Sequence, residues 1–159
     1  MNMTLKGGIV LGVLVTVFTL INGFAGLYKN PSHGWVFPVI ATVIEIGVLV
    51  WALRQTAAVK KYWGQVGTGT LIAVVGGVVI IFGSLLFTSL FPDYQEVALA
   101  NAEDGWRDAG LSQEQIDQQL PVVQAMVKPI PQAILGFVMT ILTGFVFSLI
   151  IGAFVRKKE

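Results

Sequence analysis

Cysteine is absent from this 159-residue sequence, histidine occurs once, and charged residues are scarce. Without cysteine the chain has no disulfide, no thiolate nucleophile and no cysteine metal site, and His33 alone cannot hold a metal ion. Charged residues make up 12% of the chain, against roughly 25% in soluble domains. The net charge of +1 creates no field that attracts nucleic acid. We therefore exclude a soluble enzyme, a disordered chain and a nucleic-acid partner, and expect no metal or cofactor.

Apolar residues dominate instead, at 55% of the chain, with a mean hydropathy of +0.77. They form four long blocks, of which only the second contains a charge: residues 8–27, 35–53, 67–91 and 133–155. A helix of about 20 such residues crosses the roughly 30 Å core of a bilayer. Helices satisfy their own backbone in lipid, and no alternating barrel pattern is present. The sequence predicts an all-α polytopic membrane protein, a single membrane domain over residues 1–159 with a bundle of four transmembrane helices.

Lys and Arg gather on one side of these predicted spans. Seven lie on that side and three on the other: Lys6, Arg54, Lys60, Lys61, Arg156, Lys157 and Lys158 against Lys29, Arg107 and Lys128. Short flanks rich in Lys and Arg stay in the cytoplasm, so we expect both termini there. Lys6 ahead of an apolar run is also typical of a signal peptide. No Ala-x-Ala site follows, and we expect this segment to remain uncleaved.

Small residues recur at helical spacing in three of the spans. The predicted helix-packing residues are Gly8 and Gly12 in the first span, Gly69, Gly76 and Gly83 on one face of the third, and Gly136, Gly144, Ser148 and Gly152 in the fourth. Helices in lipid associate through close packing of such residues, because lipid tails are as apolar as leucine. We favour the interpretation that these faces close the bundle on itself. The alternative is that one of them docks another protein.

Glu45 is the single charged residue inside a span, near the middle of the second. A carboxylate at the centre of a bilayer is costly, about 2.5 to 3.5 kcal/mol for Asp on insertion scales, so Glu45 should face the bundle interior. Hydroxyl groups expected near it are those of Thr42 on its own helix, Thr16 and Thr19 on the first span, and Thr140 and Thr143 on the fourth. With no cation at that depth, we expect a mostly neutral carboxyl that donates a hydrogen bond to a threonine.

A buried glutamate that binds and releases a proton is also typical of a proton-coupled carrier. Small four-helix multidrug exporters are similar in size and helix count. Their glutamate lies in the first span beside intramembrane aromatic residues, whereas here Trp and Tyr lie at boundaries or in loops. We therefore rank a structural hydrogen bond above proton transport for Glu45.

Residues 92–132 form the one sizeable polar stretch, with seven acidic and two basic residues and a net charge of −5. Ser112 and Gln115 have the spacing of a capping box, and apolar residues then recur at helical spacing from Ile116. We expect an amphipathic helical segment over about residues 92–132, between the third and fourth spans and on the extracytoplasmic side. Gly110 should end an earlier helix and Pro121 should kink or divide the later one. The segment is either a cap across the bundle mouth or a surface for a partner.

Two weaker patterns have plain interpretations. His33 lies in the turn at residues 30–34, and a solvated turn residue is favoured over a pH sensor. Residues 104–108 lack the alternating acidic ligands of a calcium loop.

The chain resembles an uncharacterised bacterial membrane family, domain-of-unknown-function family 4199. The resemblance is carried by residues 91–94 (Phe-Pro-Asp-Tyr), residues 110–116 (Gly-Leu-Ser-Gln-Glu-Gln-Ile), residues 148–151 (Ser-Leu-Ile-Ile) before a basic tail, and in part by Gly64-Gln65 and Gly67. It covers nearly the whole chain. It implies a bacterial inner-membrane location and assigns no activity, ligand or catalytic residue, and no role to Glu45.

No nucleophile with a base, carboxylate pair, phosphate loop or zinc spacing is present in the sequence, so we do not expect an enzyme. The leading hypothesis is a non-enzymatic inner-membrane protein that serves assembly or interaction, for example as an accessory subunit. The alternative is an oligomeric proton-coupled carrier or channel that uses Glu45. Expected partners are the lipid bilayer and either further copies of the chain or a larger membrane complex.

Overall fold

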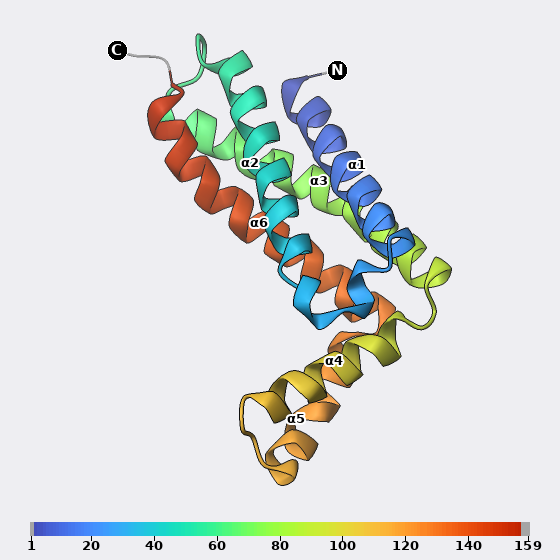
Figure 1. Cartoon of the computed structure of the whole chain (residues 1–159). Helices are drawn as coiled ribbons and strands as arrows, with labels where there is room; N and C mark the ends of the chain where they lie inside the picture. Colours follow the sequence, from blue (N-terminus) through green and yellow to red (C-terminus); the bar gives the residue numbers. More distant parts are fainter. Residues whose placement is uncertain (1, 157–159) are drawn as a thin grey trace.

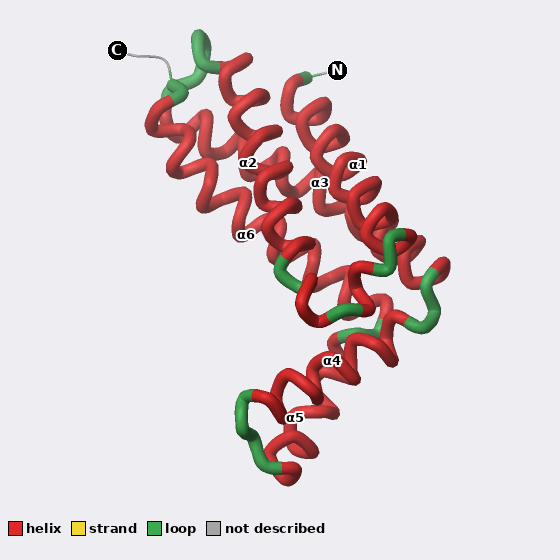
Figure 2. Tube along the Cα trace, viewed as in Figure 1, coloured by secondary structure: helices red, strands yellow, loops and turns green. Residues whose placement is uncertain are grey.

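The computed structural model describes residues 2–156, and every regular element in that range is helical (Figures 1 and 2). The α-helices are α1 (Met3–Phe24), α2 (Val36–Thr56), α3 (Tyr62–Leu90), α4 (Tyr94–Asp108), α5 (Gln113–Met126) and α6 (Pro129–Phe154), with short 3-10 helices η1 (Leu27–Lys29) and η2 (Pro31–His33) between α1 and α2. The predicted all-α fold is confirmed. Lys157 and Lys158, which the charge argument counts, lie outside the described residues.

Within residues 2–156, four helical segments are long and apolar enough to cross a membrane, and each overlaps one predicted span. They are Met3–Phe24, Pro31–Thr56, Tyr62–Leu90 and Pro129–Phe154. Large apolar side chains point away from the bundle on all four, including Val17, Val43, Phe82 and Ile150, which are about half to two-thirds exposed. Such exposure over whole helix faces is unfavourable in water and ordinary in lipid. The chain is a helical membrane protein.

The helix boundaries differ from the predicted ones at the first span. The side chain of Asn2 accepts a hydrogen bond from the Leu5 amide, so α1 begins at Met3 rather than at residue 8. The helix ends at Phe24, because Gly26 turns the backbone into the left-handed region with φ 66°. The middle of α1 therefore lies several residues earlier than predicted.

Helix α3 is the centre of the bundle and packs along α1 on one side. A Cβ added to Gly8 would collide with Val75, and one added to Gly12 would collide with Val79. The two backbones therefore approach as closely as only glycine allows. Because these partners advance together along both helices, α1 and α3 run parallel.

On another side, α3 packs along α6 in the opposite direction. Gly69 lies against Ser148, Ala73 against Gly144, and Gly77 against the ring of Phe137. The residue numbers rise on α3 as they fall on α6, so the two helices are antiparallel. Helix α2 packs against α1 and α6 and touches α3. It is antiparallel to α1, since Ala52 near its end faces Gly7 near the start of α1. Both chain ends therefore lie at one end of the bundle (Figure 1).

Two predictions about the small-residue faces were wrong. Gly69, Gly76 and Gly83 do not share one partner, because Gly69 faces α6 while Gly76 and Gly83 face Leu11 and Thr16 on α1. A seven-residue repeat drifts by about 20° per step on a straight helix, which is enough to move such residues from one neighbour to another. Gly136 packs against nothing within 4 Å of an added Cβ, because Phe137 makes the contact with α3 at that level. A Cβ added to Gly152 would lie 3.4 Å from the Cβ of Gln65, which is an ordinary van der Waals contact.

The core lies between α1, α2 and α3, where Leu11, Leu49, Ala52 and Ile72 are fully buried. Gln65 closes the end of the bundle near the chain termini and is also fully buried. Its amide donates to the carbonyl of Leu53 over 3.1 Å, and its side-chain oxygen accepts from the Thr56 hydroxyl over 2.7 Å. Gln65 thereby satisfies the last turn of α2, which otherwise leaves carbonyl groups unpaired.

Helices α4 and α5 form a hairpin at the other end and project beyond the bundle (Figure 1). Gly110 ends α4 as predicted, with φ 84°, and Ser112 and Gln115 form both bonds of the predicted capping box. Pro121 does not divide α5, which is one helix from Gln113 to Met126. Helix α4 meets the bundle through η1, and α5 contacts α6.

The packing predicts opposite effects for two glycines eight residues apart on α6. In Gly144→Ala, the new methyl group collides with Ala73 and approaches Glu45, and we expect a loss of about 1 to 3 kcal/mol of stability. In Gly136→Ala, the methyl group meets nothing, and the better helix propensity should stabilise by about 0.5 to 1 kcal/mol. Unfolding of both variants in mixed detergent micelles measures this. Equal stability of the two would contradict the close approach of α3 and α6.

Candidate functional site

Glu45 lies on α2 and faces the interior of the bundle, with 6% of its surface exposed. The Thr143 hydroxyl, on α6, donates to its Oε2 over 2.7 Å. Its other oxygen, Oε1, is buried without a hydrogen-bond partner and lies 3.0 Å from where a Cβ of Gly144 would be. The absent side chain of Gly144 thus leaves the room that the carboxyl group occupies. No ion pair among the described residues includes Glu45.

The Thr143 hydroxyl lies within hydrogen-bonding distance of two further acceptors, the carbonyls of Met139 at 2.9 Å and Thr140 at 3.2 Å. A hydroxyl carries one proton and accepts through its lone pairs. If Glu45 is the neutral acid, its O–H can donate to Thr143 while Thr143 donates to the Met139 carbonyl. If Glu45 is ionised, Thr143 must turn its proton toward the carboxylate. The hydrogen bond between Glu45 and Thr143 can therefore form in either protonation state of Glu45.

The other threonines predicted near Glu45 form no hydrogen bond with it among residues 2–156. Thr16 packs against Gly83, with its hydroxyl buried and unpartnered, and the hydroxyl of Thr19 donates to the carbonyl of Val15 on its own helix. Thr140 likewise donates to Gly136, and Thr42 lies half-buried one turn before Glu45 on α2. The earlier start of α1 explains the error for the first span, because it moves Thr16 and Thr19 toward the far end of the bundle.

A second polar group ties α4 to the end of the bundle. The Tyr28 hydroxyl on η1 donates to Asp93 over 2.8 Å, and the Lys29 ammonium pairs with the other Asp93 oxygen over 2.7 Å. The Asn101 amide on α4 donates to the Tyr28 carbonyl over 3.1 Å. The hydrogen bonds from Lys29 and then from Tyr28 lower the pKa of Asp93, and the same contacts with Asp93 raise the pKa of Lys29.

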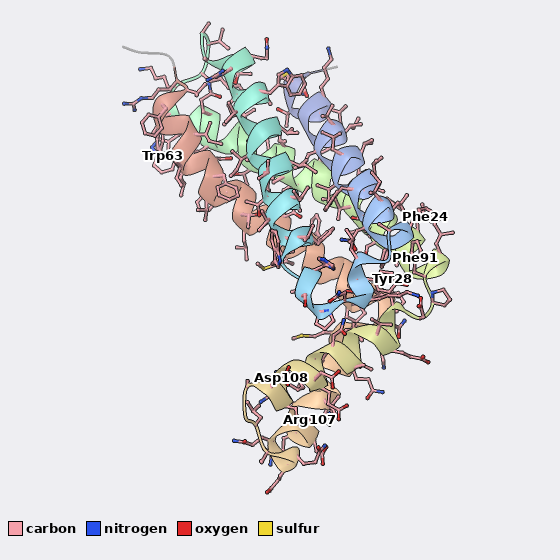
Figure 3. All side chains as sticks on the ribbon, in the orientation of Figure 1. Phe24, Tyr28, Trp63, Phe91, Arg107 and Asp108 are labelled. Carbon is pink, nitrogen blue, oxygen red and sulfur yellow. The ribbon has the colours of Figure 1, made fainter. Side chains whose placement is uncertain are left out.

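Aromatic rings pack around this group of Tyr28, Lys29, Asp93 and Asn101, which we call the anchor. Tyr28 meets Phe87, Phe91 and Tyr94 with ring centroids 5.7 to 5.9 Å apart, and Phe24 meets Phe91 edge to face. Figure 3 shows Phe24, Tyr28 and Phe91 gathered where α4 joins the bundle, while Trp63 lies at the opposite end and Arg107 and Asp108 lie on the projecting hairpin. Burial among these groups raises the pKa of Tyr94.

The rings of Tyr28, Phe87 and Tyr94 line a cavity of about 420 Å³. The cavity lies between η1, η2, α4 and the adjoining ends of α1, α2, α3 and α6. None of its lining residues is Asp, Glu, Lys or Arg, and polar lining groups include Asn22, Asn101 and Gln132. The exposed His33 lies among them, in the predicted turn. Residues 2–156 contain no group of three or more His, Asp or Glu placed to hold a metal ion.

The sequence analysis did not identify the anchor, the cavity residues or the role of Gln65. Tyr28 and Asp93 are 65 residues apart, and no spacing rule connects them. Tyr28 is one of the aromatic residues at boundaries or in loops, and Asp93 is one of the seven acidic residues of the polar stretch. The buried Asn22 and the half-buried Gln132 left a weak signal, because both are amide residues within or beside an apolar run.

The Thr143 contact predicts a stability loss when its hydroxyl is removed. Thr143→Val keeps the shape and leaves both oxygens of Glu45 without partners, so we expect about 1 to 3 kcal/mol of destabilisation. Thr140→Val is the matched control, because that hydroxyl bonds only within its own helix. Detergent unfolding compares the two. A loss no larger for Thr143→Val than for Thr140→Val would show that the contact with Glu45 contributes nothing.

The anchor predicts that acid loosens α4. The pKa of Asp93 is lower when α4 is docked than its ordinary value of 3.8, so docking is favoured above that value and weakens as the pH falls through the lowered pKa. Hydrogen exchange of the α4 amides, corrected for intrinsic rates, should therefore accelerate at pH 3 relative to pH 7. In Asp93→Asn, exchange should be fast at both pH values. If exchange in Asp93→Asn still accelerated between pH 7 and pH 3 as in the wild type, a group other than Asp93 would cause the loosening of α4 in acid.

Comparison with known proteins supports one assignment. The family model described as "Protein of unknown function (DUF4199)" matches residues 6–157. No curated protein and no solved structure matches the chain. With the four apolar helices and the match over nearly its full length, this chain belongs to the DUF4199 family.

Proposed function

We propose that the four long helices cross a bacterial inner membrane with both chain ends in the cytoplasm. The positive-inside rule supports this orientation. Lys6, Arg54, Lys60, Lys61 and Arg156 flank the end of the bundle that holds the termini, whereas Lys29, Arg107 and Lys128 belong to the other end. In this orientation the α4–α5 hairpin is an amphipathic, acidic segment on the outer side.

Within that topology, we propose a non-enzymatic protein that serves assembly or interaction, for example as an accessory subunit. The observation that carries the proposal is the projecting hairpin. On α5, Val122 and Met126 are 56% and 49% exposed and lie four residues apart, which places them on one helix face. Ile130, 66% exposed, follows at the start of α6, after the helix break at residues 127–128. Exposed apolar residues on an otherwise acidic hairpin are typical of a contact surface.

The glycine faces of the spans pack within the chain, which favours the hairpin rather than the spans as the contact surface for a partner. Gly8, Gly12, Gly69 and Gly144 each face a neighbouring helix of the same chain. These faces are thereby occupied, as the favoured interpretation of the sequence expected. Arg107 pairs with Glu103 and Asp104 on α4, leaving the outer surface strongly negative. A partner segment with apolar and basic residues would complement it.

Purification of the tagged full-length protein in mild detergent, with mass spectrometry and particle mass, tests the interaction. We expect a stoichiometric foreign partner that is lost in Met126→Lys and retained in Gln124→Lys, which adds the same charge to the opposite face of α5. A lone particle of one or more copies, or a partner equally retained by both variants, would contradict the proposed contact surface.

The alternative function is an oligomeric proton-coupled carrier or channel, and one observation favours it. Glu45 has a buried oxygen without a partner beside a threonine that can accept or donate. Glu45→Gln keeps an acceptor for Thr143 and removes the titrating group. A carrier predicts intact folding with loss of proton flux into vesicles. A structural Glu45 predicts unchanged folding and the same negligible flux in wild type and variant.

A further inference from the structure

The cavity at the outer end of the bundle contains polar groups that the chain leaves unpaired. The Asn22 side chain lines it, is 7% exposed, and forms no hydrogen bond with the described residues. The Gln132 side chain also lines it and hydrogen-bonds with Tyr94, whereas its Oε1 atom is buried without a partner. An unpaired polar group in an apolar surrounding is costly, and buried polar groups are nearly always paired. An occupant of the cavity can therefore supply partners to Asn22 and to the Oε1 atom of Gln132.

The lining defines the charge of that occupant. It contains amides, hydroxyls and one imidazole, with apolar and aromatic side chains between them, and no Asp, Glu, Lys or Arg. The nearest charged pair, Lys29 with Asp93, is engaged in the anchor. A charged ligand would lose its hydration without gaining a counter-ion. An uncharged head group with hydroxyl or amide functions can donate to Gln132 and bond with Asn22 at no such cost.

The shape of the cavity indicates where the rest of the ligand lies. Phe37 on α2, and Leu135 and Met139 on α6, line the cavity and are also 37%, 47% and 50% exposed on the outer surface of the bundle. Gly136 between them leaves open space where other residues would place a side chain. The cavity therefore meets the lipid-facing surface between the ends of α2 and α6. Its 420 Å³ falls in the range of about 300 to 1,000 Å³ typical of ligand pockets.

We propose that this cavity binds an uncharged amphiphile that enters from the membrane. The head group occupies the pocket beneath Tyr28 and Tyr94 and bonds with Asn22 and Gln132. The apolar tail leaves between α2 and α6 past Gly136. This binding site is separate from Glu45 and does not depend on the proposed interaction surface of α5.

Photolabelling of the full-length protein in phosphatidylcholine vesicles tests the site. The probe is a monoacylglycerol with a diazirine in its acyl chain, compared with the same chain carrying a sulfonate or a trimethylammonium head. We expect the neutral probe to label the lining residues of α2 and α6, and both charged probes to label them at least about fivefold less. Asn22→Leu and Gln132→Leu each remove one hydrogen bond and should reduce labelling about fivefold.

Three further variants separate ligand binding from a structural role. Gln124→Leu, on the exposed face of α5, should label as wild type does. Gly136→Leu should block the opening without loss of stability, since its Cβ meets nothing. Asn22→Leu should also keep its unfolding midpoint, because no internal hydrogen bond is lost. Equal labelling by the three probes would show no preference for an uncharged head group, and unchanged labelling in Asn22→Leu and Gln132→Leu would show that these amides do not bind it. Either result would overturn the proposal.

Discussion

Close approach of helix backbones around α3 is the constraint on which the rest of this structure depends. In lipid there is no hydrophobic driving force between apolar helices, so the bundle depends on close van der Waals packing of helix backbones at small residues. Gly8 and Gly12 provide that fit on α1, while Gly69 and Gly144 provide it between α3 and α6. Because α3 has a partner on both sides, it fixes the direction and depth of the other helices.

The same packing determines the polar features of the bundle. Gly144 leaves the space in which Thr143 can bond Glu45, so the carboxyl group is held beside the close contact of Gly144 with Ala73 on α3. Toward the end of the bundle at α4, Phe137 takes the place of a glycine in the contact of α6 with α3, and Gly136 faces open space beside the cavity. The tightly packed middle and the open end near α4 are therefore two consequences of the positions of glycine on α6. The hydrogen bond of Tyr28 with Asp93 then holds α4 over that end.

Local patterns predicted the elements of this fold better than their contacts. Long charge-free runs require helices, and the capping box at Ser112 and the end of α4 at Gly110 depend only on nearby residues. Glu45 was recognised as buried from the cost of its charge, and Thr143 was among its predicted neighbours. Depth along α1 and the partner of each glycine depend on register and on a drifting repeat, which the sequence alone does not reveal. The pairing of Tyr28 with Asp93 depends on the whole chain path.

A disulfide between α3 and α6 tests the central claim most directly, and the absence of cysteine from the chain makes the experiment clean. The Cβ of Gln65 lies 3.4 Å from the Cβ position of Gly152, close to the roughly 3.5 to 4.5 Å of a disulfide. In Gln65→Cys/Gly152→Cys, mild oxidation in native membranes should form a bond within one chain and leave a monomer on a denaturing gel. A ladder of cross-linked dimers without the internal bond would show that these faces pair between chains, and would contradict a bundle closed around α3.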